Sequence, residues 1–232
     1  MGIGLSVFLL VALLAGCSAG SSAILDTALY ASGSGKNNNS LEGSLDPRFA
    51  YLRVTVEGRP LFLARGDIDE IPQGQVEVWY SSSREVIRLL NGRLVGAVGT
   101  TIEWRGVAVP KLPSWHELAQ QKHYEWVRMR DVMPGYRFGV SDHLVLKVVP
   151  PPDKSALQSA DPLVLTWFEE SAKEPNSKSQ LVQGFEPLPT ARYAVSFAGG
   201  KEQVVYGEQC LALAFCFTWQ RWGQEPVAAN KK

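Results

Sequence analysis

The chain has 232 residues, in which 23 Lys and Arg balance 23 Asp and Glu to a formal net charge of zero. This balance lacks the basic excess of a nucleic-acid-binding protein and excludes that class. With 45% hydrophobic residues, the chain is long enough for one large domain with its own core.

The N-terminus carries a short apolar run, residues 7–15, which leads into the sequence "LAGC" ending at Cys17. The run is far shorter than the roughly 20 residues of a membrane-spanning helix. It also lacks the polar face of a core helix, and a short apolar run followed by small residues is typical of a signal peptide. The "LAGC" stretch resembles a bacterial lipobox, in which the cysteine sulfur takes a diacylglycerol; the alternative is a buried thiol. We therefore predict a lipoprotein signal peptide over residues 1–16 and lipid attachment at Cys17.

The lipobox resemblance implies a mature chain that begins at Cys17 and carries about three acyl chains, and two or more chains give stable anchoring. Ser18 follows the cysteine. In the sorting rule of Gram-negative enteric bacteria, Asp at this position retains a lipoprotein in the inner membrane, so serine indicates the outer membrane. Residues 17–45 include "SGSGKNNNSLEGS", whose Gly, Ser and Asn content predicts a flexible tether.

Residues 46–232 are predicted to form a single β-rich periplasmic domain. Apolar residues alternate in "YLRVTV" and "QVEVWY", and Asn91-Gly92 separates two further apolar runs. Asn-Gly favours φ > 0 at both central positions of a two-residue turn, which is a strong hairpin signal. Turn signals recur every 8–12 residues or so, without the alternating long helices of a parallel sheet. The predicted fold is all-β and mainly antiparallel, a barrel-like or strongly curved sheet with one or two short helices.

One helix is predicted in "PSWHELAQQKHYEW", from Trp115 to Lys122. Ser114 and Glu117 have the spacing of a capping box, in which each side chain bonds the backbone N–H of the other residue. His116 and Glu117 begin like the H-E-x-x-H zinc motif, but Gln120 stands where the second histidine must be. We therefore expect surface histidines here, and neither a metal nor a cofactor.

Catalytic motifs are also missing from the sequence, so we expect a protein that is not an enzyme. No G-x-S-x-G elbow, P-loop or Rossmann glycine pattern occurs. Glu169 and Glu170 would point to opposite faces of a strand. Asp67 and Asp69 share one parity and are the best candidates for a carboxylate pair acting on a glycoside. Their favoured interpretation is an acidic loop between strands.

Two cysteines follow in "CLALAFC", Cys210 and Cys216. In a straight strand, six steps would separate the sulfurs by about 20 Å, which excludes a disulfide. A bridge needs the segment to turn back on itself, and the periplasm permits disulfides. Free thiols and a bridge both remain open.

Most of the seven tryptophans lie in alternating strand patterns and are predicted to be core residues. Trp219 and Trp222, near the end of the last strand, are predicted to form an exposed aromatic contact with polysaccharide or a partner. Arg93 follows the Asn91-Gly92 turn. It either caps a solvated strand edge or binds a partner or an acidic polysaccharide.

The segment with Trp79 followed by two serines, then the Asn-Gly-Arg turn leading to "LVGAVG", resembles the YjbF/GfcB family. These are lipoproteins of exopolysaccharide and group 4 capsule loci. Gly92, Arg93 and Gly99 match the family pattern, whereas Ala97 stands where the family often has Thr. The resemblance covers residues 46–206, and the C-terminal "CLALAFCFTWQRW" departs from it.

The resemblance implies a mainly antiparallel, barrel-like fold. It also implies an outer-membrane lipoprotein, facing the periplasm, that acts as a non-enzymatic accessory factor in exopolysaccharide or capsule secretion or assembly. The implied partners are a large outer-membrane β-barrel and a periplasmic protein of the same locus, with the polysaccharide itself as a further candidate. Two alternatives are a half-barrel carrier of lipid or lipoprotein, and a polysaccharide-modifying enzyme that uses Asp67 and Asp69.

Overall fold

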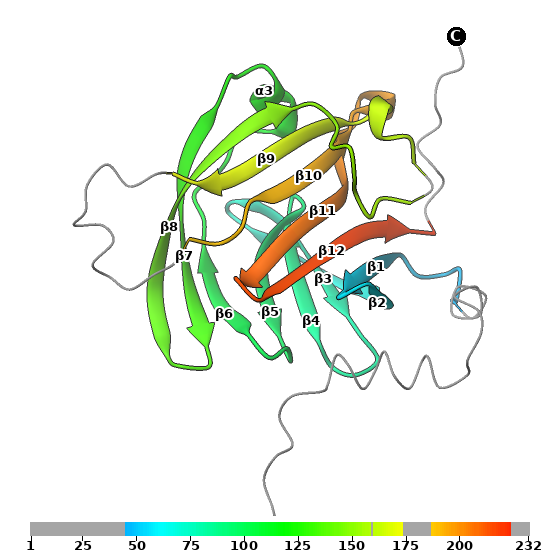
Figure 1. The fold of residues 1–232 in the computed structure, drawn as a ribbon. Coiled ribbons are helices and arrows are strands. Elements are labelled where there is room, and N and C mark those ends of the chain that lie inside the picture. The colour runs from blue at the N-terminus through cyan, green and yellow to red at the C-terminus, as the bar shows by residue number, and fades with distance from the viewer. Residues whose placement is uncertain (1–44, 159, 174–186, 224–232) are drawn as a thin grey trace, which may run out of the picture.

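The computed structural model describes residues 45–158, 160–173 and 187–223. Twelve antiparallel strands follow one another around a closed barrel, and the last strand pairs with the first (Figure 1). The predicted all-β, barrel-like fold is therefore confirmed. The predicted signal peptide, Cys17 and the tether up to residue 44 lie outside the described residues.

The strands differ in length, and those next to the long β7–β8 hairpin are short. Their bounds are β1 (Tyr51–Val56), β2 (Arg59–Ile71), β3 (Gly74–Tyr80), β4 (Val86–Leu90), β5 (Arg93–Val98), β6 (Glu103–Ala108), β7 (Tyr124–Met133), β8 (Arg137–Val149), β9 (Thr166–Ala172), β10 (Ala191–Ser196), β11 (Gln203–Ala212) and β12 (Phe215–Trp222).

The closure between β1 and β12 buries apolar side chains inside the barrel. Val54 pairs with Trp219, and these side chains are 2% and 0% exposed. Gly207 faces Trp219 from β11, and a Cβ at this glycine would lie 2.5 Å from the indole nitrogen. The absence of a side chain at Gly207 thus makes room for the Trp219 indole in the interior.

Opposite walls of the barrel contact each other directly. The Gln209 side chain on β11 accepts a hydrogen bond from the Leu94 backbone N–H on β5 at 2.9 Å. The Trp104 indole on β6 donates to the Leu211 carbonyl on β11 at 3.1 Å. A carrier of lipid or lipoprotein needs a large apolar cavity, and these side chains occupy the interior instead. The structure therefore does not favour the half-barrel carrier alternative.

A short helix, α3 (Trp115–Ala119), packs over one end of the barrel (Figure 1). Its capping box between Ser114 and Glu117 is present as predicted. The helix ends at Ala119 rather than at Lys122, because Gln120 is already the C-cap. The Trp115 side chain is buried and its indole donates to the Asn91 carbonyl at 2.9 Å. None of the helices in the described ranges has the length and apolar character needed to cross a bilayer.

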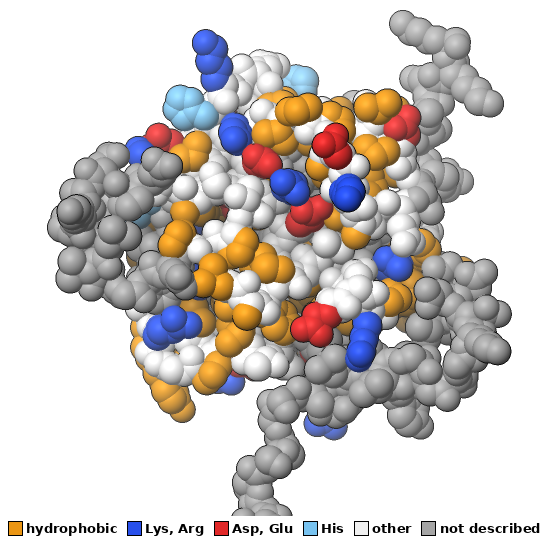
Figure 2. Space-filling model, in the orientation of Figure 1, with side chains coloured by type: hydrophobic (Ala, Val, Ile, Leu, Met, Phe, Trp, Pro, Cys, Tyr) orange, Lys and Arg blue, Asp and Glu red, His pale blue; other side chains and the backbone are white. Residues whose placement is uncertain are grey.

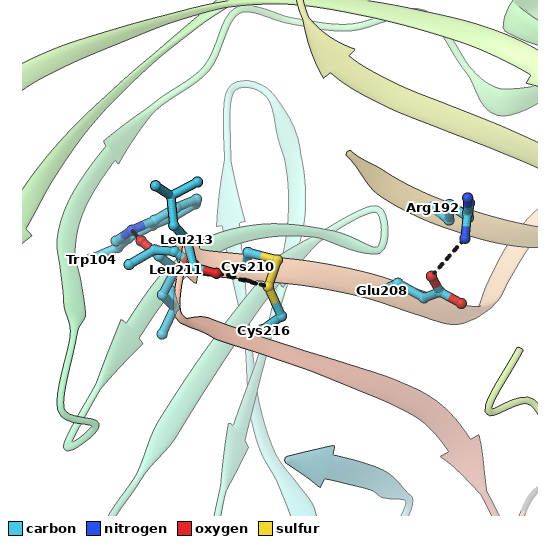
Figure 3. The surroundings of a disulfide bond; sticks show 8 residues. Trp104, Arg192, Glu208, Cys210, Leu211, Leu213 and Cys216 are labelled. Atoms are coloured by element: carbon cyan, nitrogen blue, oxygen red, sulfur yellow. Dashed lines mark hydrogen bonds and ion pairs between the residues drawn. A yellow bond between two sulfur atoms is a disulfide. The ribbon is translucent and has the colours of Figure 1, made fainter. Parts of the chain in front are cut away.

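The segment with the two cysteines turns back on itself, so the open question about them is answered by a disulfide. β11 and β12 form a hairpin in which Cys210 and Cys216 are directly opposed, and their sulfurs are bonded (Figure 3). The bridge joins neighbouring strands beside the turn that carries Leu213.

The outer wall carries a row of alternating charges across four strands. Lys147 on β8 lies 3.4 Å from Glu169 on β9, which lies 3.1 Å from Arg192 on β10. Arg192 also lies 3.4 Å from Glu208 on β11. Figure 2 shows blue and red side chains side by side on this wall. Glu169 thus faces outward while Glu170 is buried, as the strand alternation predicted.

We predict that Gly92→Ala lowers the free energy of unfolding by about 2–4 kcal/mol. The backbone of Gly92 has φ of +81°, which costs a residue with a Cβ about 1 kcal/mol. An added Cβ would also meet the Val204 side chain, and overpacking costs about 1–3 kcal/mol. Urea denaturation provides the measurement.

Gly58→Ala is the matched control. Gly58 has φ of +78°, but an added Cβ would have no neighbour within 4 Å. The free energy of unfolding of Gly58→Ala should therefore fall only by the backbone contribution of about 1 kcal/mol. Equal losses in the two variants would show that Gly92 does not pack against β11.

Candidate functional site

The barrel interior contains a cluster of charged side chains. Arg128 and Arg130 project inward from β7 and are 5% and 2% exposed. Asp142, opposite them on β8, accepts from the Arg130 Nε and Nη2 at 2.7 and 3.0 Å, and from the Arg128 Nε at 2.9 Å. One carboxylate therefore holds two guanidinium groups together.

The indole of Trp104 supports both of these arginines. The guanidinium carbons of Arg128 and Arg130 lie 4.7 and 4.9 Å from the centre of its ring. The negative face of an indole attracts a cation, and the attraction is stronger away from water. Trp104 thereby stabilises two like charges that would otherwise repel each other.

Arg93 enters the same interior from the beginning of β5, and its side chain is 4% exposed. Its guanidinium carbon lies 3.8 Å from the centre of the Trp115 ring on α3. The nearest carboxylate oxygen is that of Glu170, 3.8 Å from the Arg93 Nε. Burial lowers the pKa of Arg93, and the charge of Glu170 offsets part of this effect.

Glu170 lies near two of the arginines, Arg93 and Arg128. One of its oxygens accepts from the Tyr193 hydroxyl at 3.1 Å and lies 3.9 Å from the Arg128 Nη1. Burial raises the pKa of Tyr193 well above its usual value, and the nearby Glu170 charge raises it further. The tyrosine therefore stays a neutral hydrogen-bond donor. We call Arg93, Arg128, Arg130, Asp142 and Glu170 the interior charge cluster.

One of the two alternatives for Arg93, that it caps a solvated strand edge, was wrong, because the residue is 4% exposed. The β4–β5 hairpin folds inward, so that Gly92 contacts Val204 and the Gly92 carbonyl lies 3.5 Å from the Gln209 amide nitrogen on β11. The side chain that follows the turn is therefore drawn into the barrel and beneath Trp115. Whether Arg93 also binds a ligand or partner stays a prediction.

The two tryptophans predicted as an exposed pair lie on opposite sides of the wall. Trp219 is fully buried, so its predicted exposure was wrong; it belongs to the inward-facing residues of β12. Trp222 is half-buried on the outside, where its ring lies 5.9 Å from that of Phe62 and 5.6 Å from the Arg53 guanidinium carbon. Trp222 remains a candidate for an outer aromatic contact.

Asp67 and Asp69 lie within β2, and the predicted loop was therefore wrong. Asp67 is exposed, and Asp69 is paired with Arg88 at 2.7 Å. Within the described ranges, no group of three or more His, Cys, Asp and Glu side chains is arranged to hold a metal ion.

Sequence reasoning missed Arg128, Arg130 and Asp142 because the polarity of β7 is inverted. The apolar Val127 and Met129 are 40% and 50% exposed, whereas the two arginines between and beside them are buried. The available signal was the shared parity of the arginines with Trp126 and Val132, which are both inward-facing. A strand whose arginines align with its largest apolar residues indicates a polar barrel interior.

The fold defines a class, a closed antiparallel barrel with a charged interior. No family model matches the chain, and no curated protein matches it. Among solved structures, the chain is similar to the crystal structure of the hypothetical lipoprotein YmcC from Escherichia coli K12. The two share 15% sequence identity with a TM-score of 0.53, over 92% of this chain and all of YmcC. At this identity the similarity shows a shared fold.

We predict that Asp142→Asn lowers the free energy of unfolding by about 3–5 kcal/mol. The substitution keeps the shape of the side chain but removes the carboxylate charge that pairs with both Arg128 and Arg130 in the interior. Asp69→Asn is the control, because its pair with Arg88 is 46% and 43% exposed and should contribute less than about 1 kcal/mol. Chemical denaturation of both variants tests this, and equal small losses would contradict the buried pairing.

Proposed function

We propose that this chain is an outer-membrane lipoprotein of the YjbF/GfcB type, anchored through Cys17. We further propose that it acts as a non-enzymatic accessory factor in exopolysaccharide or capsule secretion or assembly. The observation that carries the proposal is the barrel itself, whose fold is shared along the whole length of a hypothetical lipoprotein, YmcC. The lipobox-like "LAGC" and the family pattern around Gly92 and Arg93 agree with it.

The shape of the barrel supports a docking role over a carrier role. Its walls are joined across the interior, as by the hydrogen bond between Trp104 and Leu211, and its closing strand is bridged to β11 by the disulfide. Such a body can present its outer wall to other proteins without changing shape. The proposed partners are an outer-membrane β-barrel and a periplasmic protein of the same locus, with Trp222 as a candidate contact residue.

We predict that Cys17→Ser abolishes acyl labelling and leaves the signal sequence uncleaved. A serine hydroxyl is a much weaker nucleophile than a cysteine thiolate, so it would not accept the diacylglycerol. Metabolic labelling with a radioactive fatty acid and gel mobility provide the readouts. Cys210→Ser is the control, because Cys210 is held in the disulfide and should leave labelling intact. Unchanged maturation of the Cys17 variant would overturn the lipid anchor.

We predict that deleting the gene reduces surface polysaccharide in a strain that makes it, and that the full chain restores it. Total cell-surface sugar is the measurement. Complementation with Trp222→Ala tests the outer contact residue. Complementation with Phe49→Ala is the control, because it removes another aromatic ring from a residue that is 49% exposed. Normal polysaccharide after deletion would count against the proposed function, whatever the state of the lipid anchor.

A further inference from the structure

The interior charge cluster carries an excess of positive charge. Three arginines, Arg93, Arg128 and Arg130, face two carboxylates, Asp142 and Glu170. The side chains of the arginines are at most 7% exposed. An uncompensated charge in a protein interior is strongly destabilising. Counted over these five described side chains, the cluster carries one more positive than negative charge.

The excess charge can be located at Arg93 by comparing it with Arg130. The Nε and Nη2 of Arg130 form one edge of the guanidinium, and both donate to the carboxylate of Asp142. The same two atoms of Arg93 are buried and have no hydrogen-bond acceptor among the described residues. The nearest carboxylate oxygen, at 3.8 Å from Nε, is beyond hydrogen-bond distance. The Nε and Nη2 edge of Arg93 can thus donate two parallel hydrogen bonds to two oxygens of one carboxylate or phosphate group.

The nearby carboxylates form no hydrogen bond with the Arg93 edge. Asp142 binds Arg128 and Arg130. Glu170 accepts from the Tyr193 hydroxyl through one oxygen, and its other oxygen, which is also without a hydrogen bond, lies 3.8 Å from the Arg93 Nε. Glu202 is exposed at the rim, where its carboxylate accepts from the His116 backbone N–H at 2.9 Å. Glu170 therefore attracts the Arg93 Nε without bonding either atom of the edge, and an anion that supplies two oxygens would complete it.

Helix α3 covers this position. Trp115 lies face-on against the Arg93 guanidinium, and the helix is tied to the rim through the Trp115 indole and the His116 backbone N–H. The unpaired atoms of Arg93 are closed off from solvent beneath it. A ligand would reach them from the α3 end of the barrel, and it would require Trp115 to shift.

We propose that the α3 end of the barrel binds the carboxylate or phosphate group of an anionic ligand, held bidentately by the Nε and Nη2 of Arg93, with α3 as a movable cover. The inference rests on the proposed function only in its choice of an acidic sugar as one probe. A uronic acid combines a carboxylate with a ring that Trp115 can contact. The anion site itself follows from the charge excess and the Nε and Nη2 edge of Arg93.

Thermal melts of the full-length protein test the site. Sodium acetate, sodium phosphate and sodium glucuronate are titrated at constant ionic strength, with glucose and sodium chloride as controls. A ligand that binds only the folded state raises the melting temperature with its concentration. We expect the anions, but neither control, to raise it, and glucuronate to act at the lowest concentration if the proposed function holds. Stabilisation by acetate or phosphate alone would support the anion site and count against the acidic sugar.

Arg93→Gln should weaken the apparent affinity at least about tenfold, the factor that corresponds to a loss of about 1.4 kcal/mol. Arg105→Gln is the control, because Arg105 is exposed and paired with Glu103, and it should respond as the wild type does. Equal responses of the two variants would overturn the proposal.

A crystal soaked in sodium bromide keeps the test independent of how well the Arg93 variant folds. We expect an anomalous bromide peak beside the Arg93 Nε and Nη2, because the halide offsets the excess positive charge. Bromide found only on the outer wall would overturn the interior site.

Discussion

The pairing of β1 with β12 is the constraint on which the rest of the structure depends. It converts a long antiparallel meander into a closed barrel and gives the two terminal strands of that meander a partner on each side. Closure also defines an interior, so that each strand has one face buried and one face outside. The placement of Trp219, of the arginines on β7 and of Arg93 follows from this division.

The interior of the barrel is filled by aromatic rings and arginines that stabilise one another. Trp104 contacts Arg128 and Arg130, and Trp115 covers Arg93. A guanidinium group is weakly hydrated and stacks on aromatic faces, so it enters a dry interior at a lower cost than an ammonium group would. The pairing of large rings with planar cations explains how a twelve-stranded barrel can be charged inside and still have its walls in contact.

Much of the local structure was predictable from the sequence. Asn91 and Gly92 have φ of +48° and +81°, as a primed two-residue turn requires, and the capping box at Ser114 formed as its spacing indicates. Both features depend on residues that are neighbours in the chain. The alternation of Glu169 and Glu170 is equally local, since it follows from the pleat of one strand.

The candidate site was less predictable because it depends on contacts between distant strands. The inward tilt of the β4–β5 hairpin, which buries Arg93, results from Gln209 and Val204 on β11. The alternation of β12 separates Trp219 from Trp222 but does not say which of the two faces inward. Gly207 on β11 decides this by leaving room for the Trp219 indole.

The order of the strands places the disulfide at the strand that closes the barrel. β12 is made last, yet β1 depends on it for a partner, so the barrel cannot close until nearly the whole domain has been synthesised. Contacts between such distant segments form slowly, because a long loop must be closed first. The Cys210–Cys216 bridge lies within the final hairpin and fixes β12 to β11 in one register. The strand that closes the barrel is therefore held covalently to β11 on one side while it pairs with β1 on the other.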